Sequence, residues 1–506
     1  MRSIPASFLR PGVRSARRVL GAVSASLVGA VVLASAALAA PTATAPTLAS
    51  VTDPFAACSF GGPGTNFPDA EVEPFVAVDP TNSSNLIGAF QQDRWSGGGA
   101  HGLLTAFSGN SGSTWANSFA PLSQCAGGNA ANGGDYPRSS DPWVSIGPDG
   151  RAYQVSISFA ADNSFSAVLA STSMDHGATW SNPATIVRTV SSPGVSINDK
   201  ESVTADPFRR GTAYVVWDRG QFPSDSASLT GLQHSFAFRG IPFFSKTTDG
   251  GATWSPPEAM TMQNIGSIGN QIVVEPDGTL IDVFHYGKGS GRDAPNASLQ
   301  GVMRSTDGGA HWTPPIEISN NPVVNDVDPN NGVPMRTGAD IGGGLPDIAV
   351  DPGTGKLYVV WEDSRFSGTH NDIAMSTSTD EGKTWSPPVK VNQTPKPVLA
   401  FTPNVNVLPN GTVGVTYYDI RNDPGVRSSL LTDYFIAVSK NGGSSWSEAR
   451  ITPNSFDDTF APISRGYFLG DYQGLKNDGT HFESFFVKTN SDLGNRTDVF
   501  SSTVTP

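Results

Sequence analysis

One eight-residue pattern occurs six times and constrains the fold of this chain more than any other feature. It reads Ser/Thr-x-Asp/Asn-x-Gly-x-Thr-Trp, as in Ser378–Trp385, and tolerates small changes such as His311 in place of Thr. Successive copies begin 58 to 74 residues apart, and a period of that size indicates a repeated supersecondary unit. The six copies, called boxes below, begin at Ser108, Ser173, Thr247, Ser305, Ser378 and Ser439.

The segments around each box follow one order. In the fifth copy, an apolar segment at 346–352 is followed by a turn and by an aromatic-rich segment at 358–365, which ends in acids and an arginine. A third segment at 372–376 enters the box, and a fourth at 388–391 leaves it. Apolar runs separated by Gly, Pro, Asn and Asp predict short strands joined by tight turns. Each unit is therefore predicted to be a four-stranded antiparallel meander.

The chain has one more unit than it has boxes. The seventh has predicted strands at about 468–475, 481–487 and 497–504 but lacks a fourth strand, which the stretch 48–55 is placed to supply. Four-stranded sheets repeated around an axis leave only short, protected edges. We predict an all-β β-propeller over residues 73–506, with seven blades favoured and six blades plus an extension as the alternative. First strands begin near Pro74, Pro142, Ser202, Gln271, Pro346, Pro403 and Phe468.

Residues 1–39 have the pattern of an export signal. Five arginines precede or begin the apolar run Val19–Leu38, and the small residues Ala37–Ala39 suit cleavage. A Pro- and Thr-rich stretch at 41–46 follows, where a membrane anchor would have basic residues. We expect cleavage after about Ala39, secretion, and no membrane span in the mature chain. Residues 40–72 are then a separate N-terminal segment.

The net charge limits the classes of binding partner, and the two cysteines suggest a disulfide. The whole chain has a formal net charge of −13, and the leader carries basic residues but no acid. Binding of nucleic acid or an anionic membrane through general electrostatics is therefore disfavoured. Cys58 and Cys125 are the only two cysteines, and a disulfide between them is the simplest arrangement in an exported protein, with two free thiols as the alternative.

Local turn chemistry is sufficient to explain the boxes. The Asp or Asn is expected to accept a hydrogen bond from the backbone two residues on, and the central Gly to take a positive φ. The Thr hydroxyl can bond within the turn, while the Trp buries a large ring between neighbouring sheets. No copy differs in kind from the others, so a structural role is predicted rather than a catalytic one.

The box resembles the Asp-box, or BNR, repeat of sialidases and sialidase-like β-propellers. The resemblance extends from about Glu73 to the end of the chain and implies the propeller fold. It does not imply one reaction, because the same turn occurs in sialidases, in other propeller glycosidases and in proteins without known catalysis. In such propellers the active site lies on the face opposite the box turns.

On that opposite face the resemblance places the starts of first strands and the ends of second strands, where ionisable residues concentrate. Carboxylates and guanidiniums around a channel suit an anionic or sugar-like ligand. Alternatively, each Asp/Arg pair is a salt bridge that fixes a loop. The acids at strand starts are Glu73, Asp141, Glu201, Asp347 and Asp471. The strand ends supply Asp93, Arg94, Asp218, Arg219, Asp363, Arg365, Asp419 and Arg421, and the connections supply Arg138, Arg336 and Arg465.

The resemblance also implies site roles. Sialidases hold the substrate carboxylate with three arginines and use a Tyr nucleophile activated by a Glu, with an Asp as acid/base. Their Phe-Arg-Ile-Pro motif is absent here, since 238–242 contains an inserted Gly, and this puts true sialidase activity in doubt. By repeat position, the candidates are Arg219, Arg365 and Arg421 for the clamp, Arg94 and Arg138 for further substrate contacts, Tyr472 as nucleophile, Glu201 as its partner and Asp141 as the acid.

The remaining motifs are weak. The stretch 326–332 resembles half of a calcium loop but lacks the closing Glu, so a turn is predicted. His285 ends a second strand, and the histidines show no metal-ligand spacing. We expect a monomer without cofactor or metal. The predicted function is a secreted, sialidase-like glycoside hydrolase acting on extracellular glycans; the alternatives are a non-catalytic propeller that binds glycan or protein at the cell surface, and a propeller polysaccharide lyase.

Overall fold

The computed structural model describes residues 40–190, 196–221, 239–262, 265–288, 297–337, 344–395 and 397–506. Regular structure in these ranges is β-strand, apart from the short 3-10 turn η2 (Asp458–Phe460). The predicted all-β class is therefore confirmed. None of the described residues form a helix that is long and apolar enough to cross a membrane. The predicted signal at 1–39 and Phe238 of the Phe-Arg-Gly-Ile-Pro stretch lie outside the described residues.

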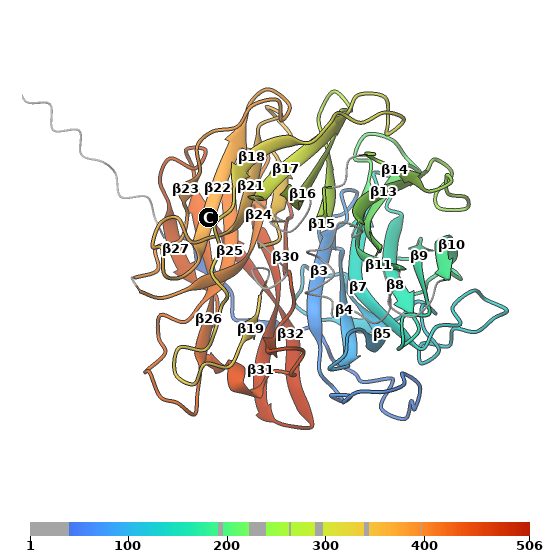
Figure 1. Ribbon diagram of the computed structural model, residues 1–506, viewed down its shortest axis with the longest axis horizontal. Helices are drawn as coiled ribbons and strands as arrows, with labels where there is room; N and C mark the ends of the chain where they lie inside the picture. Colours follow the sequence, from blue (N-terminus) through green and yellow to red (C-terminus); the bar gives the residue numbers. More distant parts are fainter. Residues whose placement is uncertain are drawn as a thin grey trace, which may run out of the picture. The chain divides into compact units, whose positions relative to one another are not determined.

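Antiparallel pairing groups the strands into successive units, in which each strand bonds to the next along the chain (Figure 1). Unit 1 contains β3 (Val72–Val78), β4 (Leu86–Arg94), β5 (Ala100–Ser108) and β6 (Ala116–Ser118). Unit 2 contains β7 (Arg138–Ile146), β8 (Ala152–Phe159), β9 (Phe165–Ser173) and β10 (Ala184–Val190). Unit 3 contains β11 (Ser196–Ala205), β12 (Ala213–Gln221), β13 (Arg239–Thr247) and β14 (Glu258–Ala259). Unit 4 contains β15 (Ser267–Val274), β16 (Leu280–Lys288), β17 (Ala297–Ser305) and β18 (Ile316–Asn320).

The same order continues to the end of the chain. Unit 5 contains β20 (Asp347–Val350), β21 (Leu357–Asp363), β22 (Asp372–Ser378) and β23 (Val389–Lys390). Unit 6 contains β24 (Ala400–Val407), β25 (Val413–Asp419), β26 (Leu431–Ser439) and β27 (Ser447–Arg450), with β28 (Phe456–Asp457) paired to β26. Unit 7 contains β30 (Gly474–Asn477), β31 (Phe482–Asp492) and β32 (Asn495–Thr505).

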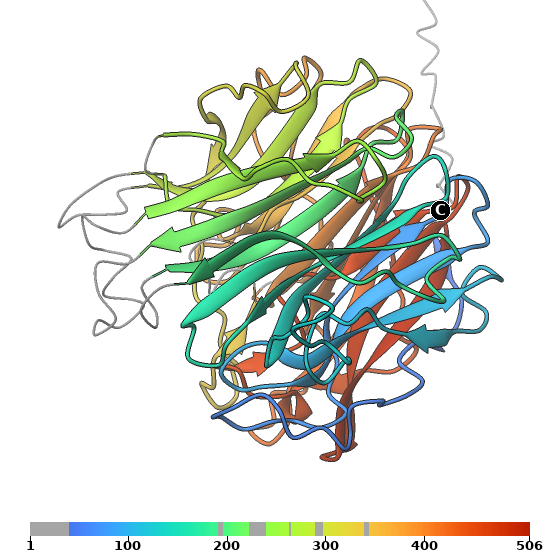
Figure 2. The ribbon, with the colours of Figure 1, turned by 90° about the vertical axis from the view of Figure 1, so that its right-hand side faces the viewer.

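The first strands of the units contact one another in a closed circuit. Each of β3, β7, β11, β15, β20 and β24 contacts the next, β24 contacts β30, and β30 contacts β3. The first unit (blue) accordingly lies beside the last unit (red) in both views (Figures 1 and 2). The starts of these strands are thereby brought to one place.

The last unit is completed by the N-terminal segment. Strands β1 (Thr42–Ala43) and β2 (Thr47–Leu48) pair antiparallel with β32, so the pairing begins earlier than the stretch 48–55 that the sequence suggested and overlaps it only at Leu48. The first strand of this unit begins at Gly474 rather than near Phe468. The reason is that Phe468 belongs to β29 (Tyr467–Phe468), which pairs in parallel with β19 (Met335–Arg336). A disulfide joins Cys58 to Cys125, with 5.7 Å between their Cα atoms, and ties the N-terminal segment to unit 1.

The hydrophobic core lies between neighbouring units. One cluster joins Phe75 of β3, Trp143 of β7, Val203 of β11 and Trp217 of β12. The Phe75 and Trp143 rings are stacked with their centroids 3.6 Å apart. Large aromatic rings at these positions bury much apolar area, which stabilises the contact between one unit and the next.

The boxes form closed hydrogen-bonded turns. In the fifth box, Ser378 Oγ donates to Asp380 Oδ1 (2.8 Å), and Thr384 donates to the same carboxylate through its backbone N–H (2.9 Å) and its hydroxyl (2.6 Å). The Asp side chain thus accepts from the backbone N–H four residues later in the chain. The prediction of a bond from the N–H two residues later was wrong. The central Gly382 has φ 77°, as predicted, and Trp385 is half-buried. In the first box Asn110 replaces Asp, and its side-chain amide donates to the Thr114 hydroxyl (2.9 Å). The side-chain bond of the turn is kept, but the Thr hydroxyl accepts it instead of donating it.

Candidate functional site

A β-bulge occurs at the same place in five of the first strands. The residue at the bulge has a positive φ in each, namely Glu73 (56°), Asp141 (54°), Lys200 (46°), Gly269 (80°) and Thr402 (51°). Four of these residues are not glycine, although a positive φ is unfavourable for a residue with a Cβ. Bulges re-aim side chains and are frequent beside active sites. Three charged side chains are therefore directed by strained backbone at this end of the strands.

Two carboxylates share a single backbone donor at the bulge of β11. The N–H of Lys200 donates to Asp141 Oδ2 (3.2 Å) and to Asp199 Oδ1 (3.1 Å), which holds the two acids side by side. Asp141 is 8% exposed and Asp199 is half-buried. Burial, followed by the negative charges of Asp141 and Asp218, raises the pKa of Asp199 to about 7. Asp199 is therefore a carboxyl group that can hold a proton near neutral pH.

Two arginines, Arg94 and Arg336, meet at Ser464, and Arg336 also pairs with Asp471. Arg336 Nη2 donates to Asp471 Oδ2 (2.9 Å), while Arg336 Nη1 and Arg94 Nη2 both donate to Ser464 Oγ (3.1 and 3.3 Å). Both guanidinium carbons lie over the Phe468 ring, at 4.4 Å for Arg336 and 4.6 Å for Arg94. The two cations thus converge on one hydroxyl.

Glu73 joins the same cluster from β3. Its carboxylate accepts from the side-chain amide of Gln91, whose Oε1 accepts from Arg94 Nη1 (2.7 Å). Burial raises the pKa of Glu73 well above its usual value, and the charges of Asp141 and Asp471 raise it further. Burial also lowers the pKa of Arg94, to about 10, although the acids around it oppose this. Glu73 is therefore a buried acid that releases its proton less readily than an exposed glutamate.

Lys200 and Tyr472 form an aromatic–cation contact at the centre of the cluster. The Lys200 ammonium lies 3.8 Å from the Tyr472 ring centroid and 4.4 Å from that of Trp143. It is 4% exposed as a residue and has no hydrogen-bond acceptor among the described residues. The Tyr472 hydroxyl donates to the backbone oxygen of Pro142 (3.1 Å). Burial and the surrounding carboxylates, Glu73 first, raise the pKa of Tyr472 well above its usual value, so its hydroxyl stays protonated.

Glu201 lies one position past the bulge, where β3 and β7 have Pro74 and Pro142. It is 0% exposed, and neither carboxylate oxygen has a hydrogen-bond partner in the described part of the chain. Burial, then the charge of Asp141, raises its pKa well above the usual value. The expected hydrogen bond between Glu201 and Tyr472 is therefore not formed.

Each of the three arginines predicted as a clamp is held by its own set of local partners. Arg365 pairs with Asp363 (2.7 Å) and donates to Ser319 Oγ (3.0 Å). Arg421 pairs with Asp419 and, at 2.6 Å, with Glu448. Arg219 reaches Ser196 Oγ at 3.5 Å and lies over the Phe243 ring. Two of the three therefore have the loop-fixing ion pairs that the sequence offered as the alternative.

Of the two further predicted arginines, only Arg94 joins the acid cluster. Arg138 instead donates to three backbone oxygens, those of Gly61 (2.6 Å), Gly98 (3.0 Å) and Pro63 (2.5 Å). Burial lowers the pKa of Arg138 to about 10. Its role in the structure is to hold the N-terminal loop against units 1 and 2.

Sequence reasoning missed Asp199 and Lys200 and ranked Arg336 too low. Aligning the strand starts by their acids placed Glu201 beside Glu73 and Asp141, whereas the bulge aligns Lys200 with them. The three consecutive charged residues at 199–201 could have indicated the bulge. An extra residue in a strand breaks the alternation of the two faces, so adjacent charged residues can be accommodated there. Arg336 lay between units and had no repeat equivalent to mark it.

The other motifs have structural explanations. The Asp326 carboxylate accepts from Asn371 (3.0 Å) and Thr337 (2.8 Å), and Asp328 caps its own turn at the N–H of Asn330 (2.8 Å). The stretch is therefore a turn. His285 is buried in β16. No cluster of three His, Cys, Asp or Glu side chains suitable for a metal is found within the described ranges.

Comparison with known proteins gives one curated relative. A sialidase of Bacteroides fragilis (strain YCH46) is 27% identical over 273 residues, which is 50% of this chain and 43% of the relative, so less than half of that sialidase is matched. No family model matches the chain. Similar solved structures include a Penicillium chrysogenum α-L-arabinanase complexed with arabinobiose (12% identity, 91% of this chain and 98% of that one, TM-score 0.46) and the Hadza microbial sialidase Hz136 (15%, 83% and 73%, TM-score 0.47). The resemblance to the sialidase-like β-propeller superfamily is supported by the curated sialidase.

Proposed function

We propose, from the resemblance to the sialidase-like superfamily, that this chain is a secreted glycoside hydrolase built as a seven-bladed β-propeller. The circuit of contacts among the first strands and the pairing of β1 and β2 with β32 support the seven blades. The leader pattern at 1–39 and the Cys58–Cys125 disulfide support secretion, because disulfides persist in oxidising compartments. Extracellular glycans are the proposed substrates.

The observation that carries the proposed reaction is the pair Asp141 and Asp199 on one backbone N–H. Most glycosidases use two carboxyl groups, one protonated and one ionised. With its pKa raised to about 7, Asp199 is suited to donate its proton to the glycosidic oxygen as the bond to the anomeric carbon breaks. The Asp141 carboxylate is then the group that attacks that carbon or activates a water. Arg94, Arg336 and Lys200 position the sugar and balance the charge.

The charges favour a neutral sugar over a carboxylated one. Among the described residues, Arg336 is already paired with Asp471, and Arg365 and Arg421 are paired elsewhere. Four acids, Glu73, Asp141, Asp199 and Asp471, lie near the three cations of the cluster. A substrate carboxylate would have to compete with Asp471 for Arg336, and with Asp363 and Asp419 for Arg365 and Arg421.

Hydrolysis of two aryl glycosides tests the proposal. The mature protein is expected to release p-nitrophenol from p-nitrophenyl α-L-arabinofuranoside or another neutral glycoside faster than it cleaves a fluorogenic sialoside. Asp199→Asn should lower kcat by about 10²- to 10⁴-fold and remove the alkaline limb of the pH profile, because the proton donor is lost. Faster sialoside cleavage would overturn the choice of sugar, and unchanged kcat in the variant would overturn the role of Asp199.

A non-catalytic glycan-binding propeller is the second candidate. The ion pairs of Arg365 and Arg421 and the bonded Tyr472 hydroxyl favour it, since they engage two of the predicted clamp arginines and the predicted nucleophile in structural contacts. Binding of an oligosaccharide without release of product, in native and Asp199→Asn protein alike, would support this candidate over the enzyme.

A further inference from the structure

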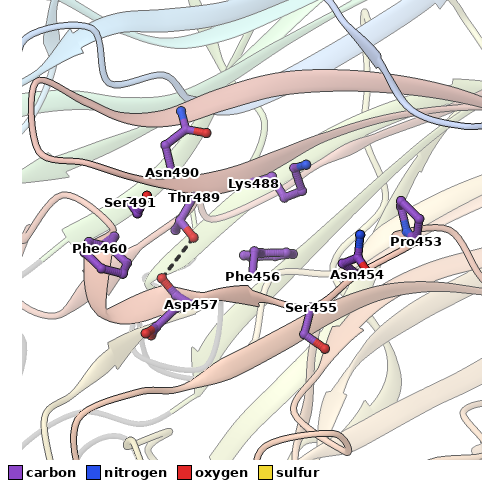
Figure 3. A pocket seen from close by; sticks show the side chains of 10 residues that line it. All are labelled: Pro453, Asn454, Ser455, Phe456, Asp457, Phe460, Lys488, Thr489, Asn490 and Ser491. Atoms are coloured by element: carbon purple, nitrogen blue, oxygen red, sulfur yellow. Dashed lines mark hydrogen bonds between the residues drawn. The ribbon is translucent and has the colours of Figure 1, made fainter.

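A groove separate from the acid cluster lies between units 6 and 7. It has a volume of about 270 Å³ and is lined by two segments, 453–460 after β27 and 488–491 at the end of β31. Figure 3 shows the two segments as facing rows, with Phe456 and Phe460 in one and Lys488 and Asn490 in the other. The groove is large enough for a small ligand rather than a folded partner.

The walls of the groove are held rigidly. Thr489 Oγ1 donates across it to the backbone oxygen of Asp457 (2.9 Å), which is the bond drawn in Figure 3. Arg496 donates to the backbone oxygen of Phe460 (3.1 Å), and Leu430 N–H donates to Asp457 Oδ1 (2.9 Å). A site that exists before binding loses less entropy when a ligand enters.

The groove also offers polar groups that the fold does not use. The Asn454 amide, the Ser491 hydroxyl and the Lys488 ammonium make no hydrogen bond to another described residue, although Lys488 lies 4.2 Å over the Phe500 ring. Phe460 is half-buried and presents part of its ring. Donors and acceptors beside an aromatic ring suit a sugar, which has hydroxyls at its rim and C–H groups on its faces.

An anion fits this groove less well. Lys488 is its single cation among the lining residues, and Asp457 lies in the opposite wall. Asp498 is a further neighbouring acid whose charge acts on Lys488. The mixed charges therefore favour a neutral, hydroxyl-rich ligand.

One segment connects the groove to the acid cluster. Phe460 in the groove precedes by four residues Ser464, whose hydroxyl receives Arg94 and Arg336. Four residues span at most about 14 Å. The groove therefore lies within about 14 Å of the serine on which Arg94 and Arg336 converge.

We propose that this groove is an outer sugar-binding subsite that holds the distal residues of a neutral oligosaccharide while its end lies at Asp141 and Asp199. Only the position of the oligosaccharide's end at Asp141 and Asp199 rests on the proposed function; binding of sugar residues in the groove does not. The substrate is then a glycan chain of several residues, and affinity rises with its length.

Binding to a printed array of neutral oligosaccharides of two to eight residues from the arabinan, galactan, xylan and mannan series tests the proposal. Native protein and Asp199→Asn should bind at least one series, with chains of four or more residues bound at least tenfold more tightly than the disaccharide. Phe460→Ala combined with Asn454→Ala should reduce that long-chain binding at least tenfold and leave disaccharide binding unchanged. Phe208→Ala, which removes a 55% exposed ring on a distant turn, is the matched control and should bind as native protein.

The outcomes separate the two proposals. Equal long-chain binding by the groove variant and native protein, or no binding to any series, would overturn the subsite. Loss of long-chain binding in the groove variant, together with the absence of any hydrolysis by native protein, would sustain the subsite and overturn the enzyme. Circular dichroism of the groove variant checks its fold.

Discussion

Aspartates occur both in the box turns and at the starts of the first strands, but their pKa values are shifted in opposite directions in the two regions. In the boxes, Asp249 is exposed and Asp380 is half-buried, and hydrogen bonds from the Thr side chain lower the pKa of each to about 2. At the other end of the strands, burial raises the pKa of Asp199, near the start of β11, to about 7 and that of its cross-strand partner Asp218, near the end of β12, to about 6. Satisfied carboxylates stabilise a turn, whereas buried carboxylates held close together are suited to move protons.

Positive φ occurs in both regions. Each box has it at its central glycine, as at Gly382 (77°) and Gly177 (84°), and also at the residue before that glycine, as at Glu381 (61°) and His176 (58°). The strand starts place Glu73, Asp141 and Lys200 in the same region, where a Cβ is unfavourable. Backbone strain therefore does not distinguish the two regions, whereas the burial of their carboxyl groups does.

The largest expected effect comes from removing an acid of the site. Asp141→Gly should lower kcat by about 10²- to 10⁴-fold, because the carboxyl group proposed to act with Asp199 is lost. It should also raise the free energy of unfolding by about 1 kcal/mol, since glycine tolerates φ 54° and the repulsion between neighbouring acids disappears. Steady-state kinetics and urea unfolding measure the two effects. Asp380→Asn in a box is the control and should leave kcat unchanged. An equal loss of kcat in both variants would contradict the assignment of a catalytic role to the strand starts and a structural role to the boxes.

A smaller and opposite effect is expected in the boxes. Gly382→Ala should lower the free energy of unfolding by about 1–2 kcal/mol, because alanine is strained at φ 77° while the space for its Cβ is adequate, with the nearest atom 3.5 Å away. Activity per folded molecule should stay the same. A stable variant, or one that loses kcat, would show that this turn is not a purely structural element.

The smallest effect is a dependence of stability on pH. Asp199 and Asp218 keep their protons in the folded protein up to about pH 7 and 6, while the unfolded chain loses them near 3.8, so their contribution to stability falls as the pH rises through that window. Asp249 and Asp380 act in reverse, and their contribution is lost as the pH falls from about 3.8 toward 2. We expect a higher urea midpoint at pH 4 than at pH 8.

Asparagine variants show which aspartate causes each part of the dependence of stability on pH. Asp199→Asn should flatten the change between pH 4 and 7, and Asp380→Asn should flatten the acid limb alone. A midpoint that rises steadily from pH 4 to 8 would contradict the raised pKa values at the strand starts.

Much of the fold followed from the sequence because its causes are local. The boxes near Ser108 and Ser439 specify their turns through neighbouring side chains, and the apolar runs between them predict strands wherever they occur. The seventh first strand was placed too early because the partner of Phe468 is Arg336, 132 positions away in the numbering, and no local pattern marks a parallel pair of that separation.

The sequence by itself determined the strands, the repeat, the turns and the end of the strands where ionisable groups gather. The tertiary structure alone decided which of those groups meet. The bulge of β11 re-aims the side chains at 200 and 201, so Lys200 contacts the Trp143 and Tyr472 rings while Glu201 is buried. Arg94 and Arg336 are far apart in the sequence and converge on the Ser464 hydroxyl, which only the tertiary structure shows, whereas Arg365 and Arg421 pair with the aspartates two positions before them.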